Sequence, residues 1–562
     1  MQKNRNLYMA GLLMLIAGLL LFFKYRHRFG IVASPTTITD KTSVEPVLGT
    51  YDRSGKRSAK LPESIRHFAI QLGSSIDQQD MRAKLFSNPD EDVLITVESG
   101  GDHVLARVVD GDLDGMIKSL CEAFPKENKH IYLRWNPEME VPVKRYSWQY
   151  QSPGDYVKAF QHFSRVCKKA SPSLNIVWGP AGYPGTEEYW PGIEAVDMVS
   201  ITLDSQSELA ATIYPVEKDR VIDIRRKIHR VRFMDKPLFI LGSERMKSDS
   251  NLRKQLAEAI RQTEKEAASI YVTFGKSVDV HQYSDAKSKP LVGVYDPKQL
   301  LLKSPAVGVE HIFTDLKSIQ DGTFEKELTD IVQRGHEAIV SIEPWRDTKI
   351  RTDTTNVLLN TINGVYDLEF NEVFRVIADA KKTVYLRFAH EMEIPIHRYS
   401  WQSQDPVLYI KAFRYFMSLQ KKGTTNVRKV WGPAGDRGAM EWWPGGDVVD
   451  YVSIAIYGLP DKNITEPTRQ ESFETIYNRK DARVRLTGKP LFVTEFGVKG
   501  PEDFQRKWME NAARMINEHH EIAGVCYFNL ADNPKVWGDI PAPDWGISKA
   551  TFDHFVQTLS NR

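Results

Sequence analysis

An internal repeat constrains the fold of this chain more than any other feature. The segment YLRWNPEMEVPVKRYSWQ, which begins at Tyr132, returns as YLRFAHEMEIPIHRYSWQ at Tyr385, an offset of 253 residues. The same offset joins VWGPAG at Val177 to VWGPAG at Val430, and it also joins three shorter blocks, WPG, VD and KPLF. A chain of 562 residues exceeds one ordinary core. The repeat therefore predicts two domains of the same fold.

Each copy alternates short β-rich runs with longer amphipathic stretches, which indicates an α/β fold. Upstream of the main blocks, GTYD at Gly49 matches GVYD at Gly293, an offset of 244 residues, so each copy spans about 250 residues. Eight strands with eight crossovers in that length predict two tandem (β/α)8 TIM barrels. In the second copy we expect strands near Leu291–Asp296, Val309–Leu316, Glu337–Trp345, Val384–Met392, Val427–Gly435, Val449–Gly458, Pro490–Val498 and Gly524–Asp532. In the first copy we expect them near Val47, Arg66, Asp92, Ile131, Leu174, Val196, Pro237 and Ala268.

One segment near the N-terminus is apolar enough to cross a membrane. Leu7–Phe23 carries no charge and as a helix would span about 26 Å, at about 1.5 Å per residue. Basic residues follow at Lys24, Arg26 and Arg28, where a cleaved signal peptide would have a small-residue cleavage site, so we favour an uncleaved signal anchor. We expect a single-pass membrane protein with the bulk of the chain extracytoplasmic, on the periplasmic or extracellular side. The charges flanking the span do not settle its orientation.

These features divide the chain into five parts. The predicted parts are a membrane anchor at 1–28, a tether at 29–45, a degenerate barrel at 46–278, a linker at 279–290 and a catalytic barrel at 291–562.

Charge and cysteine content exclude several function classes. The chain has 75 Lys and Arg against 73 Asp and Glu, a net charge of +2, so it lacks the field that gathers nucleic acid. The spacing of Cys121, Cys167 and Cys526 fits neither a disulfide framework nor a zinc motif. We therefore expect three packed thiols, no metal and an uncharged partner.

Two carboxylates of the second copy follow predicted strands. Glu391 ends the fourth strand and Glu495 ends the seventh. Because the carboxyl ends of barrel strands meet at one mouth, both side chains should face the same space. Glycoside hydrolysis needs such a pair, one to protonate the leaving oxygen and one to attack or support the anomeric carbon.

Aromatic residues gather at the same predicted end of the barrel, and sugar rings stack on indole and phenol rings through their C–H faces. This clustering predicts a sugar-binding groove rather than core packing. The residues are Trp345, Trp401, Trp442, Trp443, Tyr457, Trp537 and Trp545.

The second copy resembles glycoside hydrolase family 26, of clan A. The matching segments are RFAHEM around Glu391, WWPGGDVVD from Trp442, IAIY ending at Tyr457 and VTEFG around Glu495. The His390-Glu391 pair is the most specific of these, because most other families of the clan carry Asn before that Glu. The resemblance covers nearly all of 291–562.

That resemblance implies a retaining double displacement with Glu391 as acid/base and Glu495 as nucleophile. His390 would orient the site, and Tyr457 would hydrogen-bond the nucleophile. Known members act mainly on β-1,4-mannan and some on mixed-linkage β-glucan or β-1,3-xylan. No metal or organic cofactor is implied.

The first copy departs from this pattern at the positions that carry the chemistry. Glu138 matches Glu391, but Pro137 stands in place of His390. At the positions of Tyr457 and Glu495 the first copy has Asp204 and Gly242. We therefore expect the first barrel to be inactive, either holding glycan through residues such as Trp148 and Trp190 or bracing the second barrel.

Taken together, the residues predict a membrane-anchored endo-β-glycanase that hydrolyses a mannan-type or mixed-linkage β-glucan polysaccharide. Two alternatives stay open. One is a non-catalytic glycan-binding or scaffold component of a polysaccharide synthesis or export complex. The other is a transglycosylase that remodels a nascent glycan with the same residues.

Overall fold

A computed structural model describes most of the chain. The described residues are 35–36, 47–52, 65–72, 75–76, 91–124, 130–143, 145–203, 217–270, 289–345, 355–395, 398–458, 470–534 and 541–559. The chain divides into two compact units, Met1–Arg261 and Gln262–Arg562, each of which is considered separately below.

The second unit contains a closed barrel of eight parallel strands, so the (β/α)8 prediction for this copy is confirmed. Every neighbouring pair runs in sequence order, and β10 closes the ring against β17. The strands are β10 (Leu291–Tyr295), β11 (Val309–Asp315), β12 (Glu337–Glu343), β13 (Val384–Phe388), β14 (Val427–Trp431), β15 (Tyr451–Tyr457), β16 (Leu491–Gly497) and β17 (Ile522–Phe528).

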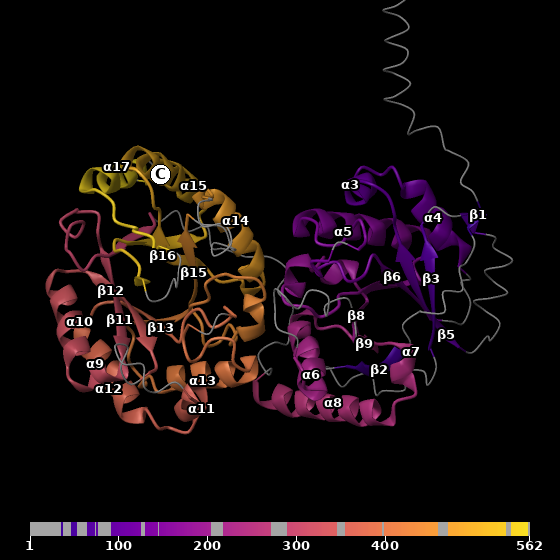
Figure 1. Ribbon diagram of the computed structural model, residues 1–562, viewed down its shortest axis with the longest axis horizontal. Helices are drawn as coiled ribbons and strands as arrows, with labels where there is room; N and C mark the ends of the chain where they lie inside the picture. The colour runs from indigo at the N-terminus through magenta and orange to yellow at the C-terminus, as the bar shows by residue number, and fades with distance from the viewer. Residues whose placement is uncertain are drawn as a thin grey trace, which may run out of the picture. The chain divides into compact units, whose positions relative to one another are not determined.

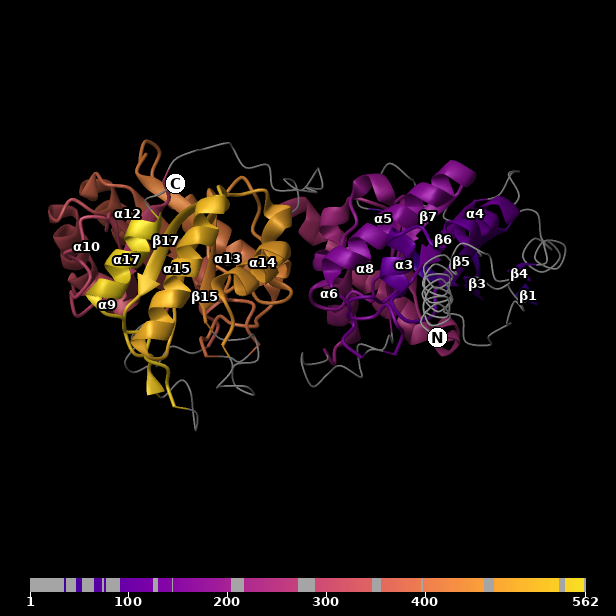
Figure 2. The same ribbon diagram turned by 90° about the horizontal axis from the view of Figure 1, so that it is seen from above.

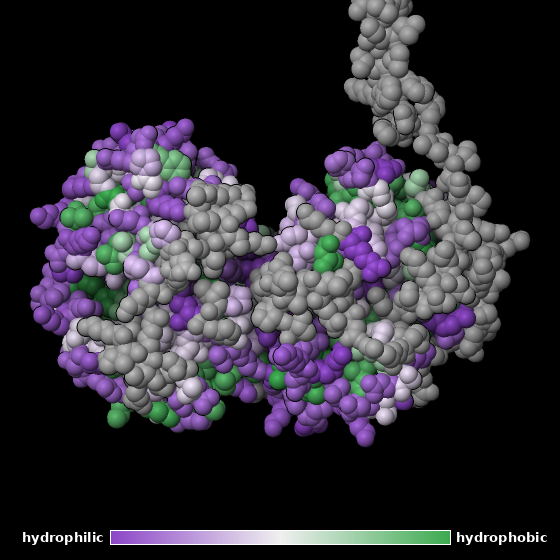
Figure 3. All heavy atoms as spheres, viewed as in Figure 1, coloured by the Kyte–Doolittle hydropathy of each residue, from purple (hydrophilic) through white to green (hydrophobic). Residues whose placement is uncertain are grey.

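Helices surround this barrel (Figure 1). They are α9 (Leu316–Gln320), α10 (Thr323–Gln333), α11 (Val357–Ile362), α12 (Asp367–Ala380), α13 (Pro406–Ser418), α14 (Phe473–Val484), α15 (Glu502–Glu518) and α17 (Lys549–Leu559), with the 3-10 turns η5 (Ala439–Trp442) and η6 (Arg485–Thr487). The turned view shows α15 and α17 side by side (Figure 2). The face in Figure 3 is mostly hydrophilic, as expected for helices that bury one apolar stripe.

One layer of side chains fills the amino-terminal half of the barrel. Its members are Val309, Ile339, Tyr385, Val430, Phe492 and Cys526. Because side chains alternate along a strand, the residues two positions further along β11, β12 and β13 also point inward, one layer closer to the mouth. That next layer is polar and is the floor of the candidate site.

The first unit has an open sheet, which corrects the prediction of a second closed barrel. Among the described residues its main sheet has seven strands, and β2 runs antiparallel to β9. The strands are β2 (Val47–Tyr51), β3 (Ile65–Gln71), β5 (Asp92–Glu98), β6 (Ile131–Trp135), β7 (Asn175–Trp178), β8 (Met198–Thr202) and β9 (Leu238–Leu241), and a separate pair is β1 (Pro35–Thr36) with β4 (Ser75–Ile76). The helices are α3 (Val104–Val109), α4 (Asp114–Ala123), α5 (Pro153–Ala170), α6 (Arg220–Arg230), α7 (Glu244–Lys247) and α8 (Ser250–Ile270), with η1 (Thr186–Tyr189), η2 (Ile193–Ala195) and η4 (Arg232–Met234).

The eighth strand predicted near Ala268 is wrong because that residue lies in α8. The sequence of α8, SNLRKQLAEAIRQTEKEAASI, consists largely of Ala, Leu, Gln, Glu, Lys and Arg, which are strong helix formers. The edge of β9 where an eighth parallel strand would pair is occupied by β2, with Val47 opposite Leu241.

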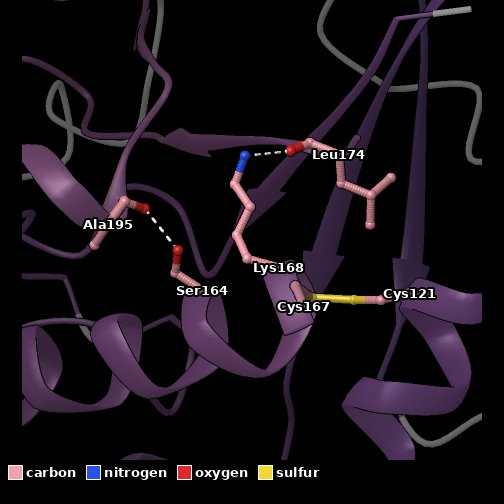
Figure 4. Close-up of a disulfide and its surroundings, with 6 residues drawn as sticks. All are labelled: Cys121, Ser164, Cys167, Lys168, Leu174 and Ala195. Atoms are coloured by element: carbon pink, nitrogen blue, oxygen red, sulfur yellow. Dashed lines mark hydrogen bonds between the residues drawn. A yellow bond between two sulfur atoms is a disulfide. The ribbon is translucent and has the colours of Figure 1, made fainter. Parts of the chain in front are cut away.

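The prediction of three packed thiols is wrong for two of the cysteines. Cys121 and Cys167 form a disulfide that joins α4 to α5, with their Cα atoms 5.4 Å apart (Figure 4). Both lie on the buried faces of their helices, which the residue spacing alone did not reveal. Near the bridge, Ser164 Oγ donates to the Ala195 carbonyl at 2.8 Å and fastens α5. Cys526 is free and buried in the second unit.

The predicted anchor at 7–23 and most of the tether and linker lie outside the described residues. Among the helices that are described, none has both the length and the apolar character of a membrane span.

Candidate active site

In the polar layer above the barrel core, the guanidinium of Arg387 contacts the carboxylate of Glu495. Arg387, on β13, and Glu495, on β16, are both buried, and Arg387 Nη1 donates to Glu495 Oε1 at 2.7 Å. Tyr457, at the end of β15, donates its hydroxyl to the other carboxylate oxygen at 3.1 Å. Each oxygen of Glu495 is therefore oriented by one donor. A buried carboxylate held by a charged donor and a neutral donor suits a nucleophile that must point in one direction.

Burial keeps Tyr457 a neutral donor. Burial, followed by the nearby charge of Glu495, raises the pKa of Tyr457 well above its ordinary value. The phenol therefore holds its proton at any working pH and can share it with Glu495. Its ring also lies 4.7 Å from that of Trp545, centroid to centroid, which fixes its direction.

Glu391 stands on an unusual turn immediately after β13. Ala389 and Glu391 both have left-handed backbone conformations, with φ of 47° and 54°. Non-glycine residues adopt this region at an energetic cost, and such strain concentrates at functional sites. The turn is held by the Glu391 N–H, which donates to the Gly432 carbonyl at 2.8 Å, and by Gln402 Nε2, which donates to the Glu391 carbonyl at 3.0 Å.

The environment of Glu391 favours its protonated form. Burial, followed by the charge of Glu495, raises the pKa of Glu391 from 4.5 to about 7. A carboxylic acid with such a pKa is half protonated near neutrality, as a general acid requires. The site therefore holds one oriented carboxylate beside one protonatable carboxyl, the division of roles that glycoside hydrolysis uses.

His390 is buried between aromatic rings. Its ring lies 5.1 Å from that of Tyr399 and 5.7 Å from that of Phe313, centroid to centroid. Burial, followed by the charge of Arg387, lowers its pKa well below the ordinary value, so the imidazole is neutral. Its backbone carbonyl accepts the indole N–H of Trp401 at 2.7 Å. The orienting role implied for His390 stays a prediction.

The predicted sugar-stacking tryptophans lie deeper than expected. Trp401 is fully buried, stacks on Tyr399 at 4.8 Å and uses its N–H on the site backbone. The others within the described residues, Trp345, Trp442, Trp443 and Trp545, are 1%, 4%, 4% and 2% exposed. Trp537 lies outside the described residues. Trp401 therefore supports the turn that carries Glu391, and direct stacking of sugar on these rings stays a prediction.

Glu393 competes with Glu391 as a candidate acid, because it too is buried and burial raises its pKa to about 8. Its Oε1, however, accepts the backbone N–H groups of Gly435 and Asp436 at 2.9 and 3.0 Å. In the first unit the matching Glu140 accepts the backbone N–H of Tyr183 at 3.0 Å. This hydrogen bond from a loop N–H to the carboxylate occurs in both units, although the first unit lacks the nucleophile. We infer that Glu393 braces a loop.

The first unit keeps the turn of the acid. The Glu138 N–H donates to the Gly179 carbonyl at 2.8 Å, and φ of Glu138 is 56°. Trp148 donates to the Pro137 carbonyl at 2.9 Å, as Trp401 does to His390. Trp148 and Trp190 are each only 2% exposed. The two copies of the repeat therefore share these hydrogen bonds as well as their sequence.

The nucleophile position of the first unit is closed by neighbouring side chains. A Cβ placed on Gly242 would lie 2.5 Å from Leu48 Cδ1 and 2.7 Å from Met246 Sδ. The matching arginine, Arg134, donates to Thr202 Oγ1 at 2.7 Å. Asp204 lies outside the described residues. Gly242 therefore has no space around it for a carboxylate.

Arg387 was not among the predicted site residues, although a signal for it is present in the sequence. The arginine stands in the repeated block as YLRW and YLRF, inside an otherwise apolar strand, three residues before His390. A charged residue at an inward strand position needs a buried partner. No cluster of three or more His, Cys, Asp or Glu suited to a metal occurs among the described residues.

Comparison with known proteins finds sequence similarity to two curated glycoside hydrolases. No family model matches it. The β-1,3-xylanase TXYA of a Vibrio species is 26% identical over 153 residues, which cover 26% of this chain and 29% of that protein. A β-1,3-xylanase of an Alcaligenes species is 21% identical over 256 residues, 44% of this chain and 48% of that protein. The chain thus spans less than half the length of these curated relatives.

Among solved structures, a family 26 β-mannanase from Bacteroides ovatus matches with a TM-score of 0.35 and 17% identity, over 48% of this chain and 88% of that one. The second unit resembles glycoside hydrolase family 26 in its motifs, and the chain is similar in sequence to curated β-glycan hydrolases.

Proposed function

We propose that the second unit is a retaining endo-β-glycanase. The observation that carries this proposal is Glu495, oriented by Arg387 and Tyr457, in the same buried site as Glu391 with its raised pKa. Glu495 attacks the anomeric carbon, and the bond to the leaving oxygen breaks as Glu391 gives that oxygen its proton. The product is a glycosyl ester of Glu495. Glu391, now a carboxylate, then takes a proton from the water that hydrolyses the ester.

The substrate is proposed to be a β-linked polysaccharide. The family resemblance points to mannan-type or mixed-linkage β-glucan chains, whereas both curated relatives carry the name β-1,3-xylanase. The panel for a first assay is therefore β-1,3-xylan, mannan, lichenan and cellulose. Chain length of the products distinguishes internal cleavage from release of end sugars.

Single substitutions test the two roles. Glu495→Ala should abolish hydrolysis of the best polysaccharide, because it removes the carboxylate proposed to form the ester. Glu391→Ala should spare the first step on aryl glycosides with good leaving groups, and azide should rescue turnover. Loss of acid assistance is worth about 10²–10⁴-fold on poor leaving groups. Glu138→Ala is the matched control in the first unit and should leave kcat unchanged.

Other outcomes identify other functions. A wild-type protein that hydrolyses no β-glycan but binds one would contradict the hydrolase proposal and favour a glycan-binding or scaffold protein. Products longer than the substrate would identify a transglycosylase. Equal losses on all leaving groups in Glu391→Ala would remove the acid role from that residue.

We also propose that residues 7–23 anchor the chain to a membrane with both units extracytoplasmic. The support is the uncharged run Leu7–Phe23 followed by Lys24, Arg26 and Arg28. The protein should sediment with membranes and keep its first residues. N-terminal sequencing that begins near Ser34 would contradict the anchor.

A further inference from the structure

A chain of buried hydrogen bonds continues from Glu495 through Arg387 to two further strands. Arg387 Nη1 also donates to Ser341 Oγ, on β12, at 3.0 Å. Ser341 Oγ in turn lies 2.8 Å from Nε2 of His311, on β11. All four side chains are at most 7% exposed, so water does not compete for these bonds. The chain links four strands of the barrel beneath the candidate site.

The direction of the hydrogen bond between Arg387 and Ser341 follows from the donors available. A guanidinium only donates, so Ser341 Oγ must accept from Arg387. His311 is neutral, because burial and then the charge of Arg387 lower its pKa well below the ordinary value. The other ring nitrogen of His311, Nδ1, makes no hydrogen bond among the described residues. The 2.8 Å contact with Ser341 Oγ is therefore the side-chain hydrogen bond that fixes the His311 ring, and Ser341 Oγ stands between the imidazole and the guanidinium.

Ser341 accepts one of the two side-chain hydrogen bonds that Arg387 donates among the described residues. Nε of Arg387 has no hydrogen-bond partner among the described residues. Its hydrogen bonds go to Glu495 and Ser341. Without the Ser341 hydroxyl, the hydrogen bond that remains to the guanidinium among the described residues is the one to the carboxylate that it is meant to orient.

We propose that Ser341, held by His311, is a positioning residue for the nucleophile: through Arg387 it fixes the direction of the Glu495 carboxylate. This inference rests on the proposed hydrolase function. A displacement of about 1 Å in the reacting atoms is enough to slow a reaction strongly. If Arg387 is less firmly held, the Glu495 carboxylate is less well aimed, and its attack on the anomeric carbon should slow.

The first unit holds a matched pair without the nucleophile. His67 Nε2 lies 2.7 Å from Thr96 Oγ1, and these two residues stand at the positions of His311 and Ser341. The His–hydroxyl pair therefore also has a structural role, which the test must separate from positioning. Thr96 further shows that a β-branched side chain fits at this position of the fold.

Two variants of equal shape separate the roles. Ser341→Thr keeps the hydroxyl and Ser341→Val replaces it with a methyl group. The readout is the rate at which a 2-deoxy-2-fluoro glycoside with a dinitrophenyl leaving group, built on the sugar of the best substrate, inactivates the full-length protein. That rate reports attack by Glu495 with little need for acid assistance. We expect about a tenfold loss in Ser341→Val and less than about a threefold loss in Ser341→Thr, since hydrogen bonds to charged groups are the strong ones.

Thr96→Val in the first unit is the matched control. It removes the same kind of hydroxyl from the same layer and should lower the melting temperature of its own unit while leaving the inactivation rate unchanged. Suppose that the wild type is active. Equal inactivation rates for Ser341→Val and Ser341→Thr would then overturn the positioning role. A loss confined to KM, with kcat unchanged, would also overturn it. A wild type that hydrolyses no glycan would instead refute the proposed function itself.

Discussion

Replacing Glu391 by Gln should stabilise the protein at alkaline pH and not at acid pH. The side chain keeps its shape, and the left-handed backbone at this position is unchanged. What disappears is a carboxyl whose pKa is about 7 in the folded protein against an ordinary 4.5. A buried carboxylate in an active site lowers the free energy of unfolding, because burial disfavours its charge. Gln removes that charge.

The sign and size follow from proton linkage. Between pH 4.5 and pH 7 the folded state keeps a proton that the unfolded state has released, so the free energy of unfolding falls as pH rises. Each unit of pKa difference is worth about 1.4 kcal/mol, which gives about 3 kcal/mol above pH 7 for the shift of Glu391. The stability contributed by the protonated form is fully present below pH 4.5. Glu391→Gln should therefore gain about 3 kcal/mol at pH 8 and almost nothing at pH 4.

Urea unfolding at pH 4, 6 and 8, followed by tryptophan fluorescence, measures this difference. Glu474→Gln, at an exposed position of α14, controls for the general effect of losing a carboxyl. In a Glu495→Gln background the gain should shrink but persist, because burial is the first cause of the shift and the charge of Glu495 the second. A gain of the same size at pH 4 and pH 8, or none at pH 8, would refute the reasoning.

Two further predictions concern the first unit. Gly242→Glu should not create a second active site and should destabilise the unit, because Leu48 and Met246 occupy the space that the new side chain needs. Hydrolysis by a Glu495→Ala, Gly242→Glu double variant would contradict this prediction. The double variant Cys121→Ser, Cys167→Ser should have a free energy of unfolding about 4 kcal/mol lower, because the disulfide closes a loop of 46 residues and so restricts the unfolded chain. A reductant should lower the melting temperature of the wild type but not that of the double variant.

The sequence predicted the second unit well because each of its signals is local. A strand such as Val384–Phe388 is a short apolar run followed by a polar turn, and its place in the barrel follows from chain order. The motif around Glu391 is likewise contiguous. The partners of Glu495 were less accessible: Arg387 lies 108 residues away in sequence, and only closure of the barrel brings the two together.

The open sheet of the first unit could not be inferred from the repeat. Similar sequence predicts similar local structure, and the acid turn at Glu138 does recur with its bonds. Closure, however, depends on a single strand at the end of the unit. There the residues of α8 favour a helix, and the antiparallel β2 pairs with the free edge of β9. The first copy therefore looks complete in sequence, although its sheet of seven strands among the described residues is open.

Loss of the nucleophile and loss of closure in the first unit are connected through one residue. Leu48 belongs to β2, the strand that runs antiparallel beside β9, and its side chain lies where a Cβ on Gly242 would be. A parallel strand at this edge would not bring the same side chain to the mouth of the sheet. With glycine at position 242 the space holds apolar side chains, and the matching Arg134 donates to the hydroxyl of Thr202. Restoring the chemistry would therefore require both the carboxylate and a different strand beside β9, which is why a single substitution should fail.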